Sequence, residues 1–362
     1  MWIERLRALS LPVSVALATG CSSCSNDHGA AHDGGTDSDS EIVFGDTTPC
    51  VNDPRPGEVC VPGGNYLMGC VPGDTDCADN EKPLVMTTLS PFFIDKKEAT
   101  IKELINFLND IKDDPGVVTD PYLGFQDDTG LHRIWGAIWN ISDSTDYVDY
   151  VLKDSDGTYV FNDAAMNECP NQGGQYAAAG GFSWLGAKMY CAWKGGRLLP
   201  TEAQWEAAAR GQTTNEFPCG SDLAECWYGV YACCNEAELC GGPYATVCHC
   251  CAPFSSDWAD DCMSPFGIYG MYGNADEWTA DYISADHSAC VDGCVDPAFP
   301  CQPYEGAVHI LKGDDMYANE GNWLRVSKRK TLNSDDGSSY TGVRCVRQDE
   351  PFVPPDAGND GG

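Results

Sequence analysis

Cysteine and histidine are the residues of this chain whose types and spacing could do the most chemistry, because thiolates and imidazoles bind zinc, copper and iron. The chain has 21 cysteines and 6 histidines. The densest group runs from Cys219 to Cys262 and includes Cys-His-Cys-Cys at 248–251, where thiolates and His249 could hold zinc. The other histidines of the long central region are widely scattered, and we expect each at the surface or in a loop: His132, His287 and His309.

The N-terminus indicates export. Arg5 and Arg7 precede an apolar run from Ala8 to Ala18, and Thr19-Gly20-Cys21 follows it. A basic start, a short apolar core and small residues before a cleavage point are typical of a secretion signal, which we assign to residues 1–20. Cys21 would then be the lipidated first residue of a bacterial lipoprotein. We therefore expect a lipid-anchored protein of the bacterial cell envelope, at the outer membrane or cell surface. The alternative is an ordinary cleaved signal with a chance cysteine.

Export changes the interpretation of the cysteines. Lipidation of Cys21 would leave an even number, which in an exported chain indicates a disulfide framework. Adjacent cysteine pairs are then more typical of staples in a loop-rich insertion, here about 212–265, than of a zinc site. Spacing alone leaves the pairing of these cysteines open.

The net charge argues against nucleic acid as a partner. It is −34 for the whole chain, and removing Glu4, Arg5 and Arg7 with the signal would make it −35. Such a chain repels phosphate backbones and anionic lipid, so we expect membrane contact through the lipid anchor only.

The globular region is expected to span 57–348. Residues 21–56 lack large apolar side chains for most of their length and suggest an acidic flexible tether, and residues 349–362 suggest a disordered tail. Helices are predicted after Thr100, with Glu103 completing a capping box, after Ser183, and after Thr201 as far as Gly211. Asp156-Gly157 predicts a hairpin between 147–152 and 158–161.

Four blocks of the sequence resemble the formylglycine-generating enzyme family, also called the sulfatase-modifying-factor family. In chain order they are G-G-N-Y-L-M-G at 63–69, P-F-F-I-D-K-K-E-A-T at 91–100, the stretch 181–211 with R-L-L-P-T-E-A-Q-W-E, and F-G-I-Y-G-M-Y-G-N-A-D-E-W at 266–278 leading to G-V-R-C at 342–345. The resemblance implies an α+β fold that is a variant of the C-type-lectin fold, disulfide-rich and with little regular secondary structure. It also implies a disulfide between Cys191 and Cys345.

The resemblance implies a copper(I) site made by two cysteines five residues apart, and this chain departs from it. Aligning the family's Arg-Cys-x-x-Arg with 325–329 places Gly321 and Val326 at those positions, and no cysteine lies between Cys301 and Cys345. Copper is therefore not expected. An iron-dependent branch of the superfamily needs an H-x-x-x-H helix, which the scattered histidines do not provide.

Calcium is the cofactor that the resemblance leaves open. The matching ligand positions are Gly270, Gly273, Ala275 and Glu277, and Gly270 lacks the usual side-chain oxygen. Asp276 stands where the family has Trp and could compensate, although adjacent side chains need not point the same way.

We therefore predict a non-catalytic ligand-binding or structural module, with an unknown peptide, protein or glycan as partner. The candidate binding residues lie in the segment that corresponds to the family's active-site groove: Asp314, Asp315, Asn319, Asn322, Trp323 and Arg325. The alternative for this segment is that Trp323 fills the core and the acids are solvated. The competing function is a metal-dependent oxidoreductase with an atypical site, either a formylglycine-generating-type oxidase or a non-haem iron oxygenase.

Overall fold

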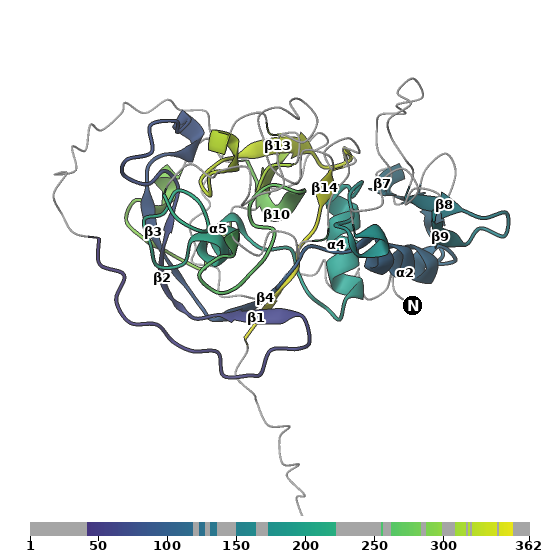
Figure 1. The fold of residues 1–362 in the computed structure, drawn as a ribbon, viewed down its shortest axis with the longest axis horizontal. Coiled ribbons are helices and arrows are strands. Elements are labelled where there is room, and N and C mark those ends of the chain that lie inside the picture. The colour runs from purple at the N-terminus through teal and green to yellow at the C-terminus, as the bar shows by residue number, and fades with distance from the viewer. Residues whose placement is uncertain are drawn as a thin grey trace, which may run out of the picture.

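The structure, a computed structural model, describes residues 42–118, 123–126, 131–135, 150–163, 173–221, 255, 262–283, 287–298, 308–315, 318, 321–338 and 340–349. Among these residues the chain forms three α-helices, several single turns of 3₁₀-helix and many short strands (Figure 1). No helix of this described part is long and apolar enough to cross a membrane.

The helices begin where local capping chemistry predicts. Helix α2 (Ile101–Ile111) and helix α5 (Glu202–Arg210) each start with a capping box, in which the N-cap threonine and the third helical residue bond reciprocally. Helix α4 (Trp184–Trp193) starts at Ser183, whose hydroxyl accepts from the Gly186 N–H. All three predicted helices are confirmed, because these signals act within one turn of the chain.

The strands form several small sheets. The sheet orders are β1-β4-β15, β13-β12-β10-β14, β11-β3-β2, β5-β6-β7 and β8-β9. The strands are β1 (Glu58–Val61), β2 (Gly64–Met68), β3 (Val85–Leu89), β4 (Phe92–Asp95), β5 (Val117–Val118), β6 (Leu123–Gln126), β7 (Leu131–Trp135), β8 (Val151–Lys153), β9 (Tyr159–Phe161), β10 (Asp276–Tyr282), β11 (Cys294–Val295), β12 (Val308–Lys312), β13 (Lys330–Asn333), β14 (Thr341–Gly342) and β15 (Val346–Gln348). The hairpin predicted at Asp156-Gly157 is the β8-β9 pair.

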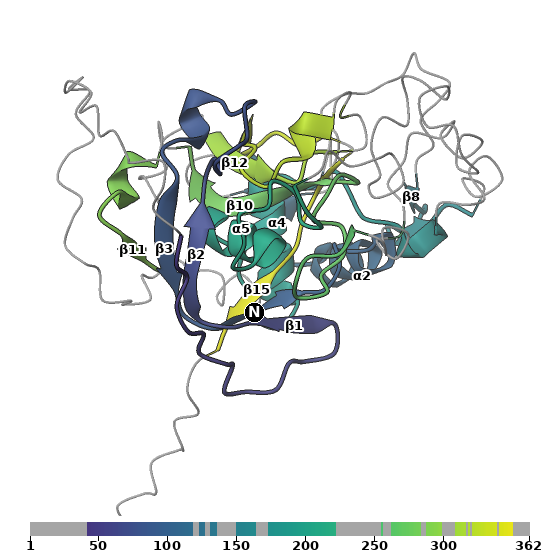
Figure 2. The same cartoon turned by 60° about the vertical axis from the view of Figure 1, so that its left-hand side comes forward.

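Two large apolar cores hold these elements together, and a third, smaller cluster surrounds Phe217 and Tyr272. One core surrounds α2 and α4, where Phe107 and Tyr190 pack edge to face. The other lies between α5 and the β2-β3 pair, with Trp205 at its centre. Figure 1 shows α2 and α4 together beside β8 and β9, and Figure 2 shows α5 between β2 and β10. Strands β10 and β12 contribute residues to the first core, and both strands also contact α5.

Disulfides join distant parts of this frame. Cys191 in α4 is bonded to Cys345 before β15, which is the pairing implied by the family resemblance. Cys219 and Cys262 are bonded near the two ends of the predicted insertion. The remaining pairs in the described part are Cys50–Cys60, Cys70–Cys77 and Cys290–Cys294.

The N-terminal boundary of the folded region differs from the predicted one at residue 57. Thr48 forms a β-bridge with Gly63, and Cys50 is bonded to Cys60. The Asn52 N–H and side-chain amide both donate to the carboxylate of Asp349, at 3.1 and 2.6 Å. The end of the predicted tether and the first residue of the predicted tail are thus fastened to each other and to the domain. The tether prediction was wrong for this part, because one disulfide and one carboxylate replace the missing apolar side chains.

Candidate functional site

Four charged side chains meet at one end of the sheet β13-β12-β10-β14. Asp276 is the first residue of β10, Asp314 and Asp315 follow the end of β12, and Lys330 is the first residue of β13. Strand β12 is antiparallel to both β10 and β13, so its end lies beside the starts of both neighbours. The topology therefore gathers residues that are far apart in the sequence. We call Asp276, Asp314 and Asp315 the acidic cluster.

The ammonium of Lys330 is the shared partner of the acidic cluster. Its Nζ lies 2.7 Å from Asp276 Oδ2, 2.8 Å from Asp315 Oδ2 and 3.3 Å from Asp314 Oδ1. The three aspartates are only 1, 6 and 5% exposed, in the same order. Burial raises the pKa of Asp276 well above its usual range, and the neighbouring carboxylates raise it further while Lys330 opposes the rise. Burial also raises the pKa of Asp314, against the effect of Lys330.

Glu277 points away from this cluster and has different partners. Successive side chains of a strand face opposite sides, so Asp276 and Glu277 cannot serve one site together. The buried Glu277 carboxylate accepts from Arg344 Nη2 at 2.7 Å and Nε at 3.0 Å, and from Trp205 Nε1 at 2.6 Å. It therefore holds α5 and the segment before β15 against β10. The suggestion that Asp276 compensates within the calcium block is not supported by this geometry.

The four predicted calcium positions do not by themselves offer a complete oxygen site. Gly270 has no side-chain oxygen, both oxygens of Glu277 are engaged, and the Gly273 carbonyl accepts from the Ala275 N–H at 3.0 Å. A Cβ at Gly270 would lie 2.3 Å from Glu98 Oε2. The carboxylate of Glu98 thus fills the place beside Gly270 that a larger side chain would need. The side chains at these four positions therefore do not fit a calcium ion.

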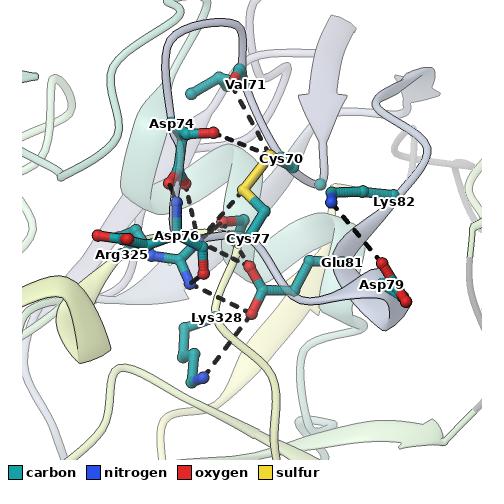
Figure 3. Close-up of a disulfide and its surroundings, with 12 residues drawn as sticks. Cys70, Val71, Asp74, Asp76, Cys77, Asp79, Glu81, Lys82, Arg325 and Lys328 are labelled. Atoms are coloured by element: carbon teal, nitrogen blue, oxygen red, sulfur yellow. Dashed lines mark hydrogen bonds and ion pairs between the residues drawn. A yellow bond between two sulfur atoms is a disulfide. The ribbon is translucent and has the colours of Figure 1, made fainter.

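Arg325, a predicted ligand-binding residue, is instead buried and paired with Glu81 and Asp74 (Figure 3). We call these three residues the clamp. Its Nη1 lies 2.7 Å from both Glu81 Oε2 and Asp74 Oδ2, and its Nη2 donates to the Asp76 carbonyl at 2.9 Å. Burial alone would lower the pKa of Arg325, but the hydrogen bonds and charges of Glu81 and Asp74 raise it. Asp74 and Asp76 lie in the loop closed by the Cys70–Cys77 disulfide, and Cys77 Sγ is 3.4 Å from Nη1. Arg325 therefore holds this loop against its own segment of the chain.

The turn just before Arg325 contains the accessible part of the predicted site. In η5 (Gly321–Leu324) the Trp323 side chain is 39% exposed, and Asn322 is half-buried. The Asn322 carbonyl accepts from Arg325 Nε at 2.8 Å, so the turn rests on the clamp. The alternative that Trp323 fills the core is wrong. Asn319 lies outside the described residues.

The two positions aligned with the copper cysteines have no thiol. Val326 is fully buried in the core beside α5, and Gly321 begins η5. Two disulfides contact this segment instead: Cys77 Sγ lies 3.4 Å from Arg325 Nη1, and Cys262 packs in one apolar cluster with Leu324.

Two of the scattered histidines are buried: His309 lies in strand β12, contrary to the prediction of a surface or loop position, whereas His287 lies in a loop as predicted. His309 is fully buried, stacked on Trp184 with ring centres 3.8 Å apart, and its Nδ1 is 3.1 Å from the Asp281 carbonyl. Burial lowers the pKa of His309 to about 3, so its ring is neutral at ordinary pH. His287 is also fully buried, with Nε2 3.7 Å from Glu202 Oε2. Aromatic stacking makes a neutral imidazole acceptable inside the protein.

Several predictions fall on residues that the structure does not describe. They concern the signal at 1–20, lipidation of Cys21, most of the insertion at 212–265 with His249, and the tail beyond Asp349. Sequence reasoning also missed Lys330, Glu81 and Asp74. Only the antiparallel pairing of β12 with β13 would have placed Lys330 beside the aspartates.

Comparisons with known proteins agree with the fold. The formylglycine-generating enzyme of Thermomonospora curvata is 28% identical over 80% of this chain and 93% of that protein. A Bos taurus protein named inactive C-alpha-formylglycine-generating enzyme 2 is 26% identical over 80% of this chain and 87% of its own length. The solved structure of PvdO from Pseudomonas aeruginosa superposes with a TM-score of 0.54 at 19% identity, over 80% of this chain and 94% of that one.

The family assignment follows from the extent of the match. The predicted α+β fold, a disulfide-containing variant of the C-type-lectin fold, agrees with the observed elements and with the solved relative. The family model described as the sulfatase-modifying factor enzyme 1-like domain matches residues 44–349, beginning inside the predicted tether. This chain belongs to the formylglycine-generating-enzyme-like family of sulfatase-modifying factors.

Proposed function

We propose that this protein is an exported, lipid-anchored member of the family whose domain binds a peptide, protein or glycan ligand and does not oxidise cysteine by the copper route. One observation carries the proposal: Gly321 and Val326 stand at the aligned positions of the copper cysteines. Val326 is also fully buried, so a ligand reaching it would have to open the core. The relative named as inactive supports the idea that this scaffold is used without the oxidation.

The binding surface in this proposal is the η5 turn. A tryptophan ring offers a large contact area at low cost in conformational entropy, and it is enriched where partners bind. Trp323 is partly exposed, and the clamp of Arg325, Glu81 and Asp74 holds its turn in place. A rigid base reduces the entropy that is lost when a ligand binds. Stacking on this ring suits a sugar face or a peptide side chain.

Export and anchoring are supported by the cysteines. Disulfides persist in oxidising compartments and are rare where thiols are kept reduced. The described residues contain five of them, joining segments from Cys50 to Cys345. The segment before Cys21 provides the signal that such a location requires. Mass spectrometry of the mature N-terminus tests the anchor, since a diacylglyceryl Cys21 is expected and an unmodified N-terminus at another residue would contradict it.

The test of the non-oxidative function uses the mature protein with copper(I), oxygen and a Cys-x-Pro-x-Arg peptide. We expect no formylglycine product, while the Thermomonospora curvata relative assayed in parallel serves as the positive control. Elemental analysis should find neither copper nor iron in the purified protein. Conversion of the peptide, or stoichiometric copper or iron, would favour the competing metal-dependent oxidoreductase.

The test of ligand binding uses arrays of glycans and of peptides, probed with the mature domain. A binding signal should be lost in Trp323→Ala and kept in Tyr176→Ala, because Tyr176 is 54% exposed but lies on another turn, η2 (Gly174–Tyr176), which packs on α2. Equal loss in both variants, or a signal that survives in Trp323→Ala, would remove η5 from the proposal.

A further inference from the structure

The acidic cluster brings three buried carboxyl groups together. Asp276, Asp314 and Asp315 offer carboxylate oxygens that lie within 4.8 Å of one another, and all three residues are buried. Among the described residues, the ion pairs of Asp276 and Asp314 lead to a single cation, Lys330. Buried charges are retained in proteins when they are paired or bound to metal. A second positive charge at this place would therefore be stabilised.

One oxygen of the cluster lacks a partner. Asp276 is 1% exposed, and its Oδ2 is bonded to Lys330, whereas its Oδ1 has no hydrogen-bond partner in the described part of the molecule. A buried carboxylate oxygen without a partner is costly. This oxygen is an open ligand position that no described side chain fills.

Lys330 already acts as a stand-in cation. Its ammonium lies 2.7 to 3.3 Å from all three aspartates, which shows that the carboxylates converge on one positive centre. The side chain is also 40% exposed, unlike the aspartates. A long, partly exposed lysine can swing to solvent without disturbing the core, because its four-carbon stem is flexible. The centre can thus be vacated while the carboxylates stay in place.

We propose that Asp276, Asp314 and Asp315 form a site for a hard divalent cation, with Lys330 as its built-in competitor. Carboxylate oxygens are the ligands that Ca²⁺ and Mg²⁺ prefer, and the cluster contains neither thiolate nor imidazole. A divalent ion in place of the ammonium neutralises one more negative charge. The site differs from the positions Gly270, Gly273, Ala275 and Glu277, because Asp276 and Glu277 face opposite sides of β10.

Calcium titration of the mature protein tests this proposal. The protein is stripped with EDTA, dialysed, and titrated with Ca²⁺ by calorimetry. We expect Lys330→Gln to bind Ca²⁺ at least about tenfold more tightly than wild type, because a positive charge has left the ligand set. Lys328→Gln is the matched control, since Lys328 is a neighbouring, partly exposed lysine that contacts Glu81 instead, and it should bind as wild type does. Equal affinities in the two variants would overturn the proposal.

A second variant and a measurement on wild type keep the test independent of folding. The double variant Asp314→Asn, Asp315→Asn should lose one bound Ca²⁺ per chain, and retention of every site would contradict the assignment. In wild type, Ca²⁺ should increase acylation of Lys330 by an amine-reactive reagent several-fold, read by mass spectrometry against Lys328. Unchanged labelling of Lys330 at saturating Ca²⁺ would show that the ammonium stays in the cluster and that the acids are purely structural.

Discussion

Replacing Glu277 by glutamine tests whether this residue is a structural ion-pair partner or a calcium ligand. The substitution keeps the size of the side chain and removes its charge. It leaves the fully buried guanidinium of Arg344 without its carboxylate, and it sets amide hydrogens against guanidinium hydrogens. We expect a large loss of stability that does not depend on calcium.

The magnitude follows from what remains around Arg344. Breaking a buried ion pair by removing one partner costs about 3–5 kcal/mol. Arg344 keeps its bonds to the carbonyls of Asp95 at 2.9 Å and Tyr269 at 2.7 Å, which favours the lower part of this range. For about 3–4 kcal/mol, at roughly 2–4 °C per kcal/mol, the melting temperature should fall by roughly 6–16 °C.

Urea unfolding of the oxidised protein, followed by tryptophan fluorescence, measures the effect with EDTA and with Ca²⁺. Asp335→Asn is the matched control, because that carboxylate is exposed and contacts only His132 among the ion pairs of the described residues, so it should cost less than about 1 kcal/mol. A Glu277→Gln variant as stable as this control would refute the ion-pair argument. A loss seen only with Ca²⁺ present would make Glu277 a calcium ligand.

Three further predictions concern the Cys191–Cys345 disulfide, the loss of stability at low pH and the ion pairs of Arg325. Replacing Cys191 and Cys345 by alanine should lower the free energy of unfolding in urea by about 2–5 kcal/mol, because this disulfide closes a separation of 154 residues. Replacing Cys290 and Cys294 should cost less, because their sequence separation is only 4. Equal losses would contradict the explanation by loop entropy. Burial lowers the pKa of His309 to about 3, so the unfolded chain binds a proton before the folded chain does. The free energy of unfolding should therefore fall as the pH drops from about 6.5 towards 3. His309→Phe should reduce the slope of this free energy against pH by up to one proton, and an unchanged slope would contradict the prediction. Arg325→Met should lower the free energy of unfolding by about 3–5 kcal/mol, because Glu81 stays buried without this partner. The control Lys328→Met should lower it by less than about 1 kcal/mol. Similar losses in the two variants would argue against the clamp.

The parts of the fold that sequence predicted correctly depend on neighbouring residues. The capping boxes at Thr100 and Thr201 and the Asp156-Gly157 turn are complete within a few positions, so their geometry is fixed before any tertiary contact. The family resemblance added the pairing of Cys191 with Cys345, which spacing alone could not give. These signals predicted the helices, the hairpin and one disulfide, but not the contacts of the candidate site.

The candidate site depends on contacts across long stretches of chain, and here prediction was less successful. Arg325 was expected to face a ligand because its segment corresponds to a groove, yet its partners Glu81 and Asp74 lie about 250 positions earlier. His309 was expected at the surface or in a loop, yet it lies in β12, where Trp184 offers it a stacking partner. No local pattern reports such neighbours, because they are fixed by sheet register and by one disulfide loop.

The departures of this chain from its family are energetically linked. Asp276 stands where the family resemblance places Trp, and Asp314 and Asp315 lie beside it, so each acid alone would bury a carboxylate at a cost of several kcal/mol. Together they share Lys330, which offsets part of that cost, and they leave Asp276 Oδ1 unpaired among the described residues. Replacing a buried group of ion pairs by apolar side chains of similar volume is often neutral or stabilising, so stability alone is a weak reason for this cluster. In our proposal, these carboxyl groups hold a cation that enters when Lys330 leaves.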